Sequence, residues 1–186
     1  MRYWFDTEFI EDGKTIDLIS IGIVAEDGRE LYLQNEECAF QRANQWVKEN
    51  VLVYLTDFVY PMPLYEPEAD HVWRSRNAMK LEIQKFIGHD GPEFWAYYAD
   101  YDWVVLCQLF GTMIDLPKGW PMYCRDLKQW CDSMGNPKLP EQGKGEHHAL
   151  ADARWNKQAW EFLIDYEVQH VTYHRPLPSP EVEQAK

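Results

Sequence analysis

The chain has 186 residues, a formal net charge of −13 and a sequence pI near 4.8. Because 46% of its residues are hydrophobic and 15% aromatic, it can build a core, and we expect one domain over residues 1–175. The Pro-rich segment 176–186 is expected to be a flexible tail. The acidic charge excludes a protein that coats nucleic acid through a broad basic face. A nucleic acid would therefore be held over a few nucleotides, with the help of metal ions.

The sequence contains no sign of membrane insertion or export. No apolar run reaches the roughly 18 residues of a membrane helix, and strand-like sequence begins directly at the N-terminus without a signal-peptide pattern. We therefore expect a cytoplasmic protein that does not enter a membrane. The 4 cysteines include no CxxC pair, which favours free structural thiols over a metal or redox site.

The first part of the chain has the pattern of an antiparallel meander. Asp-Gly occurs in EDGK at 11–14 and in EDGR at 26–29, and between strands this dipeptide predicts a hairpin with a type I′ turn. We expect strands at 2–9, 15–25 and 29–34. The middle strand is almost continuously apolar, so it should be well buried.

The remaining chain combines helices with one further strand. Apolar positions recur at helical spacing in several segments. These predict helices near 43–53, 69–87, 102–111, 125–135 and 149–170. Residues 93–99, EFWAYYA, are expected to form a strand. Together the elements predict a mixed α/β domain in which helices flank a central sheet.

The stretch YWFDTEF places two carboxylates within an apolar strand. Since side chains alternate between the faces of a strand, Asp6 and Glu8 should point to one side, with Cβ atoms about 6.5–7 Å apart. A carboxylate taken out of water without a partner costs several kcal/mol. Either cations lie between the two acids, or this face is solvated with Arg2 as a neighbour. The DxE pattern by itself does not decide between these alternatives.

Two later segments supply further polar groups. In YADYDWVVL, Asp102 lies where a strand gives way to an apolar helix, near the strand end at which α/β sheets place their sites. In GEHHALADA, His147 precedes the last helix and Asp152 lies in its first turns. In one regular helix these two would be about 140° apart, so they converge only if His147 belongs to the preceding loop. The alanines around Asp152 would let that helix approach a sheet closely. Each residue alone also has an ordinary reading, since an acid in a first turn suits the helix dipole.

Taken together, the acids suggest a metal site. Four carboxylates, Asp6, Glu8, Asp102 and Asp152, suit two divalent ions about 3.5–4 Å apart, as in two-metal phosphodiester hydrolysis. Oxygen ligands favour Mg²⁺, with Mn²⁺ as a substitute, over Zn²⁺. One ion would activate water and the other would stabilise the leaving 3′ oxygen. His147 could take the proton of the water.

The motifs resemble those of a known family, the DEDDh 3′–5′ exonucleases, which includes oligoribonuclease and RNase T. The resemblance rests on FDTEF, YADYDWVVL and HHALADA, at 5–9, 98–106 and 147–153. It implies the RNase H-like exonuclease fold. It also implies that Asp6, Glu8, Asp102 and Asp152 are the metal ligands and that His147, rather than His148, is the general base.

The whole chain is similar to a small actinobacterial group of 3′–5′ exoribonucleases, through DTEFIEDG and the following LISIG. This similarity implies Mg²⁺-dependent release of nucleoside monophosphates from single-stranded RNA or an RNA 3′ overhang, and a homodimer. Many relatives follow DxE with a Thr-Gly pair, where this chain has Phe9 and Ile10. Either could pack on the last base, which is typically worth about 1–3 kcal/mol. Thr7 and Lys144 complete the candidate substrate contacts.

Other functions are compatible with these residues. The same site could serve a 3′–5′ DNA exonuclease or an oligonucleotidase. A catalytically silent nucleic-acid-binding domain is a further alternative, although all five expected catalytic residues are present. A zinc hydrolase that uses His147 and His148 would need another ligand at a suitable spacing, and the remaining histidines do not offer one. For most members of a set of tryptophans that includes Trp46, core or dimer packing is expected rather than base stacking.

Overall fold

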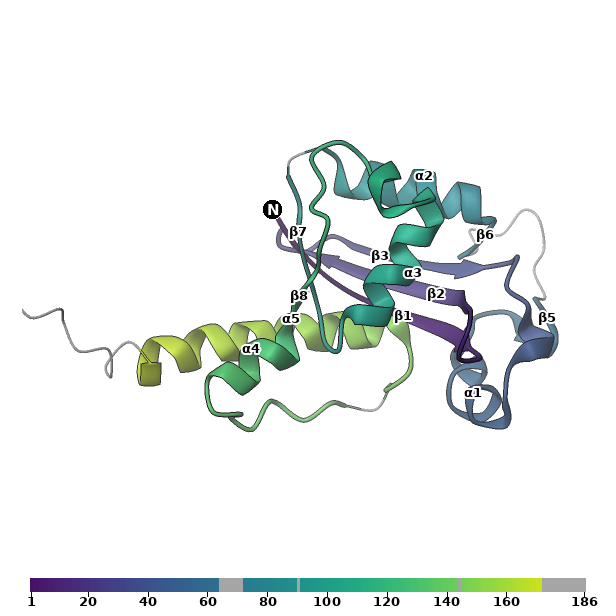
Figure 1. Cartoon of the computed structure of the whole chain (residues 1–186). Helices are drawn as coiled ribbons and strands as arrows, with labels where there is room; N and C mark the ends of the chain where they lie inside the picture. Colours follow the sequence, from purple (N-terminus) through teal and green to yellow (C-terminus); the bar gives the residue numbers. More distant parts are fainter. Residues whose placement is uncertain (64–71, 90, 144, 172–186) are drawn as a thin grey trace, which may run out of the picture.

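The computed structural model describes residues 1–63, 72–89, 91–143 and 145–171, and it is built around a mixed sheet of six strands (Figure 1). The strands are β1 (Arg2–Glu11), β2 (Ile16–Ala25), β3 (Glu30–Asn35), β6 (Trp73–Arg74), β7 (Glu93–Ala96) and β8 (Arg125–Asp126). Their order is β6-β3-β2-β1-β7-β8. Neighbours among β1, β2 and β3 are antiparallel, whereas β7 is parallel to β1 and to β8. This order and these directions confirm the predicted RNase H-like fold with its three-stranded meander.

Helices cover both faces of the sheet (Figure 1). The α-helices are α1 (Gln45–Asn50), α2 (Arg76–Ile87), α3 (Asp100–Phe110), α4 (Leu127–Ser133) and α5 (Ala149–Tyr166). Short 3₁₀ turns occur at Phe40–Arg42, Leu52–Tyr54 and Met113–Asp115, a π-turn follows α5 at Glu167–Val171, and Phe58–Val59 (β4) pairs with Met62–Pro63 (β5). Among the described residues, none of the helices combines the length and apolar character of a membrane span.

The two faces of β1 contact different layers. Tyr3 and Phe5 pack into the main core with residues of α2 and α3. Trp4, which points the other way, meets Trp160 of α5 with ring centroids 5.3 Å apart. Asp6 and Glu8 follow Trp4 in the alternation, so they point toward α5, while Thr7 points toward α3. Side chains on both faces of β1 are thus placed to meet helices.

Both predicted hairpins form, but the predicted type I′ turns are wrong. That turn requires positive φ at both central residues, and within these two loops only Gly13 (φ 80) and Gly28 (φ 89) have it. The aspartates instead close the loops with their side chains. Asp12 Oδ1 accepts from the Thr15 N–H at 2.7 Å, and Asp27 Oδ1 accepts from the Arg29 N–H at 3.1 Å. Asp is common in turns because of this local hydrogen bonding.

The helix expected at 69–87 begins later than predicted. Trp73 and Arg74 instead form β6 beside β3, and α2 starts after Ser75, whose hydroxyl accepts from the Ala78 N–H. Residues 69–71 lie outside the described part of the chain. A local sequence pattern could not reveal β6, because its partner is a strand far away in the chain.

The other elements agree with expectation apart from their ends. The predicted strand at 93–99 ends at Ala96, and the segment expected as a helix at 125–135 begins with β8, so that α4 starts at Leu127. The region 43–53 divides into α1 and a 3₁₀ turn, and the last helix gives way to the π-turn after Tyr166. The predicted tail, 176–186, lies outside the described residues.

Candidate active site

A pocket of about 340 Å³ opens beside the second half of β1. β7 pairs with β1 only from Arg2 to Trp4, so the strand loses this neighbour before Asp6. Side chains from both faces of β1 can therefore reach one space. The pocket is lined by Asp6, Thr7, Glu8, Phe9, Trp46, Val51, Tyr97, Tyr98, Tyr101, Asp102, His147 and Asp152. All five residues predicted to be catalytic are among them.

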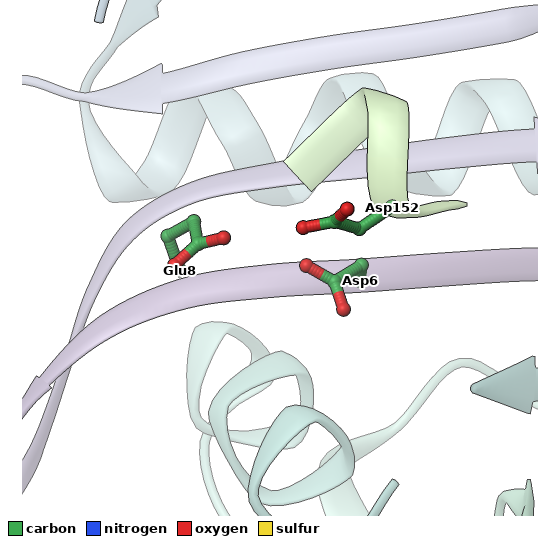
Figure 2. Close-up of side chains that lie close together, drawn as sticks. All are labelled: Asp6, Glu8 and Asp152. Carbon is green, nitrogen blue, oxygen red and sulfur yellow. The ribbon is translucent and has the colours of Figure 1, made fainter. Parts of the chain in front are cut away.

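Three carboxylates form a compact group at the pocket wall. Figure 2 shows Asp6 and Glu8 along β1 and Asp152 entering from the start of α5. One oxygen from each lies within 4.8 Å of the others. The expectation that Asp6 and Glu8 share a face of the strand is confirmed. Asp152, far away in the sequence, completes the group because α5 crosses β1 at this point.

The close approach of α5 depends on Gly22. This residue pairs with Asp6 in the neighbouring strand. A Cβ atom built there would lie 2.3 Å from the Leu150 nitrogen and 2.4 Å from the carbonyl of Ala149. Of the alanines expected to permit close packing, Ala149 and Ala153 are buried at 0% exposure, whereas Ala151 is half-buried. The glycine partner was missed, although a lone glycine in an apolar strand is a known sign of close backbone approach.

A second contact ties α5 to β1. Asn156 is 1% exposed, and its side-chain amide donates to the Phe5 carbonyl at 2.8 Å. Phe5 immediately precedes Asp6, and Asn156 lies one helical turn after Asp152. This hydrogen bond therefore fixes the position of Asp152 on the helix relative to Asp6 on the strand.

Asp102 reaches the pocket from the other face of β1. It lies in the first turn of α3 and does not belong to the three-carboxylate group. Its Oδ1 accepts from the Thr7 N–H at 2.9 Å and from the Thr7 hydroxyl at 2.5 Å. Thr7, predicted as a substrate contact, thus holds a carboxylate, and its role toward substrate stays a prediction.

His147 lies in the loop before α5, as convergence with Asp152 requires. Its backbone N–H donates to Asp152 Oδ2 at 2.8 Å, and its ring forms a T-shaped contact with Trp46, with ring centroids 4.8 Å apart. His148 has a different role, because its Nδ1 accepts from the Ala151 N–H as the N-cap of α5 and its ring stacks on Tyr32. Of the two histidines, only His147 lines this pocket.

Aromatic rings surround the carboxylates. Tyr98 is 64% exposed, Trp46 53% and Tyr101 51%. Phe9 stacks on Tyr101 with an angle of 14° between the rings. Ile10, predicted to contact substrate, is instead 3% exposed and packs in the core cluster that includes Phe40 and Trp73. Lys144 lies outside the described residues. The exposure of Trp46 differs from the packing role expected for most tryptophans.

Comparison with known proteins identifies the family. The model of the Rv2179c-like 3′-5′ exoribonuclease domain matches residues 1–164. The chain belongs to this family. The resemblance to 3′–5′ exonucleases inferred from the three motifs is thereby confirmed.

Two curated members of the Rv2179c-like family come from Mycobacterium tuberculosis. They are the 3′-5′ exoribonuclease Rv2179c of strain ATCC 25618 / H37Rv and the 3′-5′ exoribonuclease MT2234.1 of strain CDC 1551 / Oshkosh. Each is 45% identical over 157 residues, covering 83% of this chain and 88% of the relative. The structure of the Neurospora crassa Pan2 catalytic unit (protease and nuclease domain) aligns with 95% of this chain and 30% of its own, at 13% identity and a TM-score of 0.41.

The pocket of this Rv2179c-like chain concentrates negative charge. Burial raises the pKa of Glu8 to about 8, and repulsion from Asp152 and Asp102 adds to the effect. Burial also raises the pKa of Asp6 well above its usual value and that of Asp102 to about 6, although the Thr7 hydrogen bonds oppose the latter. Among the described lining residues there is no lysine or arginine. The donor set therefore suits divalent cations with a preference for oxygen ligands.

This charge predicts that the metal-free protein loses stability as pH rises. An acid whose pKa is raised by folding stabilises the protein fully at any pH below its unfolded-state pKa, and this stabilisation is lost as pH rises through its folded-state pKa. For Glu8 these two pKa values are 4.5 and about 8, and for Asp102 they are 3.8 and about 6. In EDTA the melting temperature should therefore fall between about pH 5 and pH 8.5, by about 2–4 °C per kcal/mol lost. Mg²⁺ or Mn²⁺ should restore it at pH 8.5.

The matched variant for this pH scan is Glu8→Gln, which removes the carboxyl group whose pKa is raised to about 8. Its melting temperature should change less with pH than that of the wild type between about pH 6.5 and 8.5. Burial lowers the pKa of His148, so this residue makes the protein more stable as pH rises. Both proteins contain His148, so its effect does not contribute to the difference between them. An identical pH dependence in wild type and variant would contradict the charge assignment.

Proposed function

We propose that this chain is a metal-dependent 3′–5′ exoribonuclease that hydrolyses the terminal phosphodiester of RNA and releases nucleoside monophosphates. The supporting observation is the group formed by Asp6, Glu8 and Asp152, with oxygens within 4.8 Å of one another. Asp102 and His147 line the same pocket. The family supports the same activity, since its model is named for it.

In this proposal Asp6, Glu8, Asp102 and Asp152 hold two Mg²⁺ ions, for which Mn²⁺ substitutes. The fit rests on the chemistry of the donors, which are buried or half-buried carboxylates. Burial raises their pKa values, and repulsion from neighbouring acids adds to the effect at Asp6 and Glu8. Bound ions of this kind supply activation of water and stabilisation of the leaving 3′ oxygen. The protein contributes a rigid arrangement, in which Thr7, Gln142 and the His147 N–H each donate to a carboxylate.

His147 is the proposed general base. A neutral imidazole can accept the proton of the attacking water as the oxygen bonds to phosphorus. The hydrogen bond between the His147 N–H and Asp152 keeps the backbone beside the carboxylate group. The T-shaped contact with Trp46 restricts the imidazole ring. Proton transfer by a positioned histidine is typically worth about 10²–10⁴-fold in rate.

The proposed substrate is single-stranded RNA or an RNA 3′ overhang. Exposed rings of Trp46, Tyr98 and Tyr101 border the carboxylates, and Phe9 stacks on Tyr101. Stacking on aromatic rings requires unpaired bases and tolerates different sequences. Contacts of Thr7 and Lys144 with substrate, the homodimer, the cytoplasmic location and a single domain over 1–175 stay predictions from the sequence.

A time course on 5′-labelled single-stranded RNA and matched DNA tests the proposal. Each would be incubated with Mg²⁺, Mn²⁺, Zn²⁺ or EDTA. We expect a ladder of one-nucleotide steps that shortens from the 3′ end of RNA with Mg²⁺ or Mn²⁺, and no shortening in EDTA. Preferential shortening of DNA would favour the DNA exonuclease alternative. Activity with Zn²⁺ alone would favour a different hydrolase.

The matched variant in this assay is His147→Asn. It should lower the rate by about 10²-fold or more while Mn²⁺ still binds, because the acids that would hold the metal remain. An unchanged rate would remove the histidine from the proposed mechanism. If neither polymer is shortened by the folded wild-type protein with any metal, the catalytic proposal fails and the binding-domain alternative becomes the better one.

A further inference from the structure

We propose that Gln142 is a positioning residue for Asp152. Its side-chain amide would orient the carboxylate toward the metal site and fasten the loop that carries His147. This inference rests on the proposed function, because it assigns Asp152 a role in metal binding. It adds a residue that none of the sequence motifs contains.

Both oxygens of Asp152 accept hydrogen bonds from the loop between α4 and α5. The Gln142 side-chain nitrogen donates to Oδ1 at 2.5 Å, and the His147 N–H donates to Oδ2 at 2.8 Å. One donor is a side chain and the other belongs to the backbone. A substitution can therefore remove the Gln142 donor alone, while the backbone donor remains.

The chemistry of a glutamine suits this position. Its amide is a neutral donor, so it restricts the carboxylate without cancelling the negative charge that attracts a cation. A lysine or arginine in its place would form an ion pair and compete with the metal. Partners that orient metal ligands in this way are typically worth about 10–100-fold in metal affinity or activity.

The loop has a second attachment to α5 that does not involve Asp152. The Trp155 indole N–H donates to the Pro140 carbonyl at 3.1 Å. Gln142 is half-buried and also borders a neighbouring hollow of about 290 Å³, which Asp152 and Trp155 line as well. Gln142 therefore lies outside the packed core, and its replacement leaves the Trp155 attachment in place. The orientation of Asp152 and the general order of the loop can be tested separately.

The test is a titration of the RNA-free, full-length protein with Mn²⁺, in which binding is measured by calorimetry. We expect Gln142→Leu, which keeps a similar volume and removes the donor, to weaken Mn²⁺ binding by about 10–100-fold. Gln142→Ala should weaken Mn²⁺ binding to a similar extent. Because alanine is small, this variant excludes the explanation that leucine displaces the loop by its bulk. Trp155→Phe removes the second attachment and should stay within about 3-fold of wild type. In the RNA assay, Gln142→Leu should need correspondingly more Mg²⁺, with the KM for RNA unchanged at saturating Mg²⁺.

Each result is informative. Wild-type affinity in both Gln142 variants overturns the inference and leaves the proposed function intact. An equal loss in Trp155→Phe also overturns it, because general loop order would then explain the effect. If the wild-type protein binds no Mn²⁺, the metal role of Asp152 fails, and the proposed function and this inference fall together. Selective loss in the Gln142 variants supports the assignment.

Discussion

Replacing Asp6 with asparagine is expected to abolish RNA shortening and, in EDTA, to raise the melting temperature of the protein. Asp6 borders both Glu8 and Asp152, and burial together with repulsion from the other acids raises its pKa well above the usual value. Asparagine keeps the shape but removes the charge. The metal-free fold loses an unfavourable interaction, while the proposed site loses a ligand.

The two effects should be large enough to measure independently. Metal ions contribute several kcal/mol of transition-state stabilisation, so the rate should fall by about 10³-fold or more. The melting temperature in EDTA near pH 8 should rise by about 2–4 °C for each kcal/mol of repulsion relieved. A stabilised, inactive variant is the expected signature of a residue kept for function at the expense of stability.

Asp12→Asn is the matched control for this variant. Asp12 lies in the turn after β1, where hydrogen bonds from Thr15 and Lys14 lower its pKa to about 2. Its charge therefore favours the fold, and its removal should leave activity unchanged without raising the melting temperature. Asp6→Asn would contradict the proposed site if it retained wild-type activity, or if its Mn²⁺ affinity equalled that of Asp12→Asn.

Replacing Gly22 with alanine is expected to destabilise the protein and to impair activity together. The added Cβ would lie 2.3–2.4 Å from backbone atoms of Ala149 and Leu150. These atoms belong to the start of α5, so the helix must shift away from β2. Overpacking of this kind typically costs 1–3 kcal/mol and occasionally more, and we expect about 3 kcal/mol, or about 6–12 °C in melting temperature.

The functional effect follows from the same movement. Gly22 pairs with Asp6, and the displaced helix carries Asp152. A misplacement of about 1 Å can cost about 10²-fold in rate, so activity should fall even at temperatures where the variant is folded. Gly143→Ala is the control, because a Cβ there meets no atom within 4 Å. Full activity of folded Gly22→Ala would show that the contact between α5 and β2 does not set the site.

Local patterns in the sequence predicted much of the secondary structure and part of the site. Period-two alternation placed Asp6 and Glu8 on one face, and helical spacing identified the helices apart from their ends. The angle between His147 and Asp152 in a regular helix required a loop before α5, and that loop is present. These inferences succeeded because they depend on backbone geometry over a few residues.

Contacts between distant segments were decided only by the tertiary structure. Thr7 meets Asp102 across 95 positions in the chain. Gly22, which has no side chain, lets the backbone of Ala149 and Leu150 at the start of α5 lie close to β2. The pairing of β6 with β3 and the exposure of Trp46 beside His147 likewise follow from packing. A single sequence records which residues can take part in such contacts but not which will meet. Burial of the apolar faces of the sheet and helices selects the partners. It thereby brings the carboxylates of β1 into one pocket with Asp152 of α5 and Asp102 of α3.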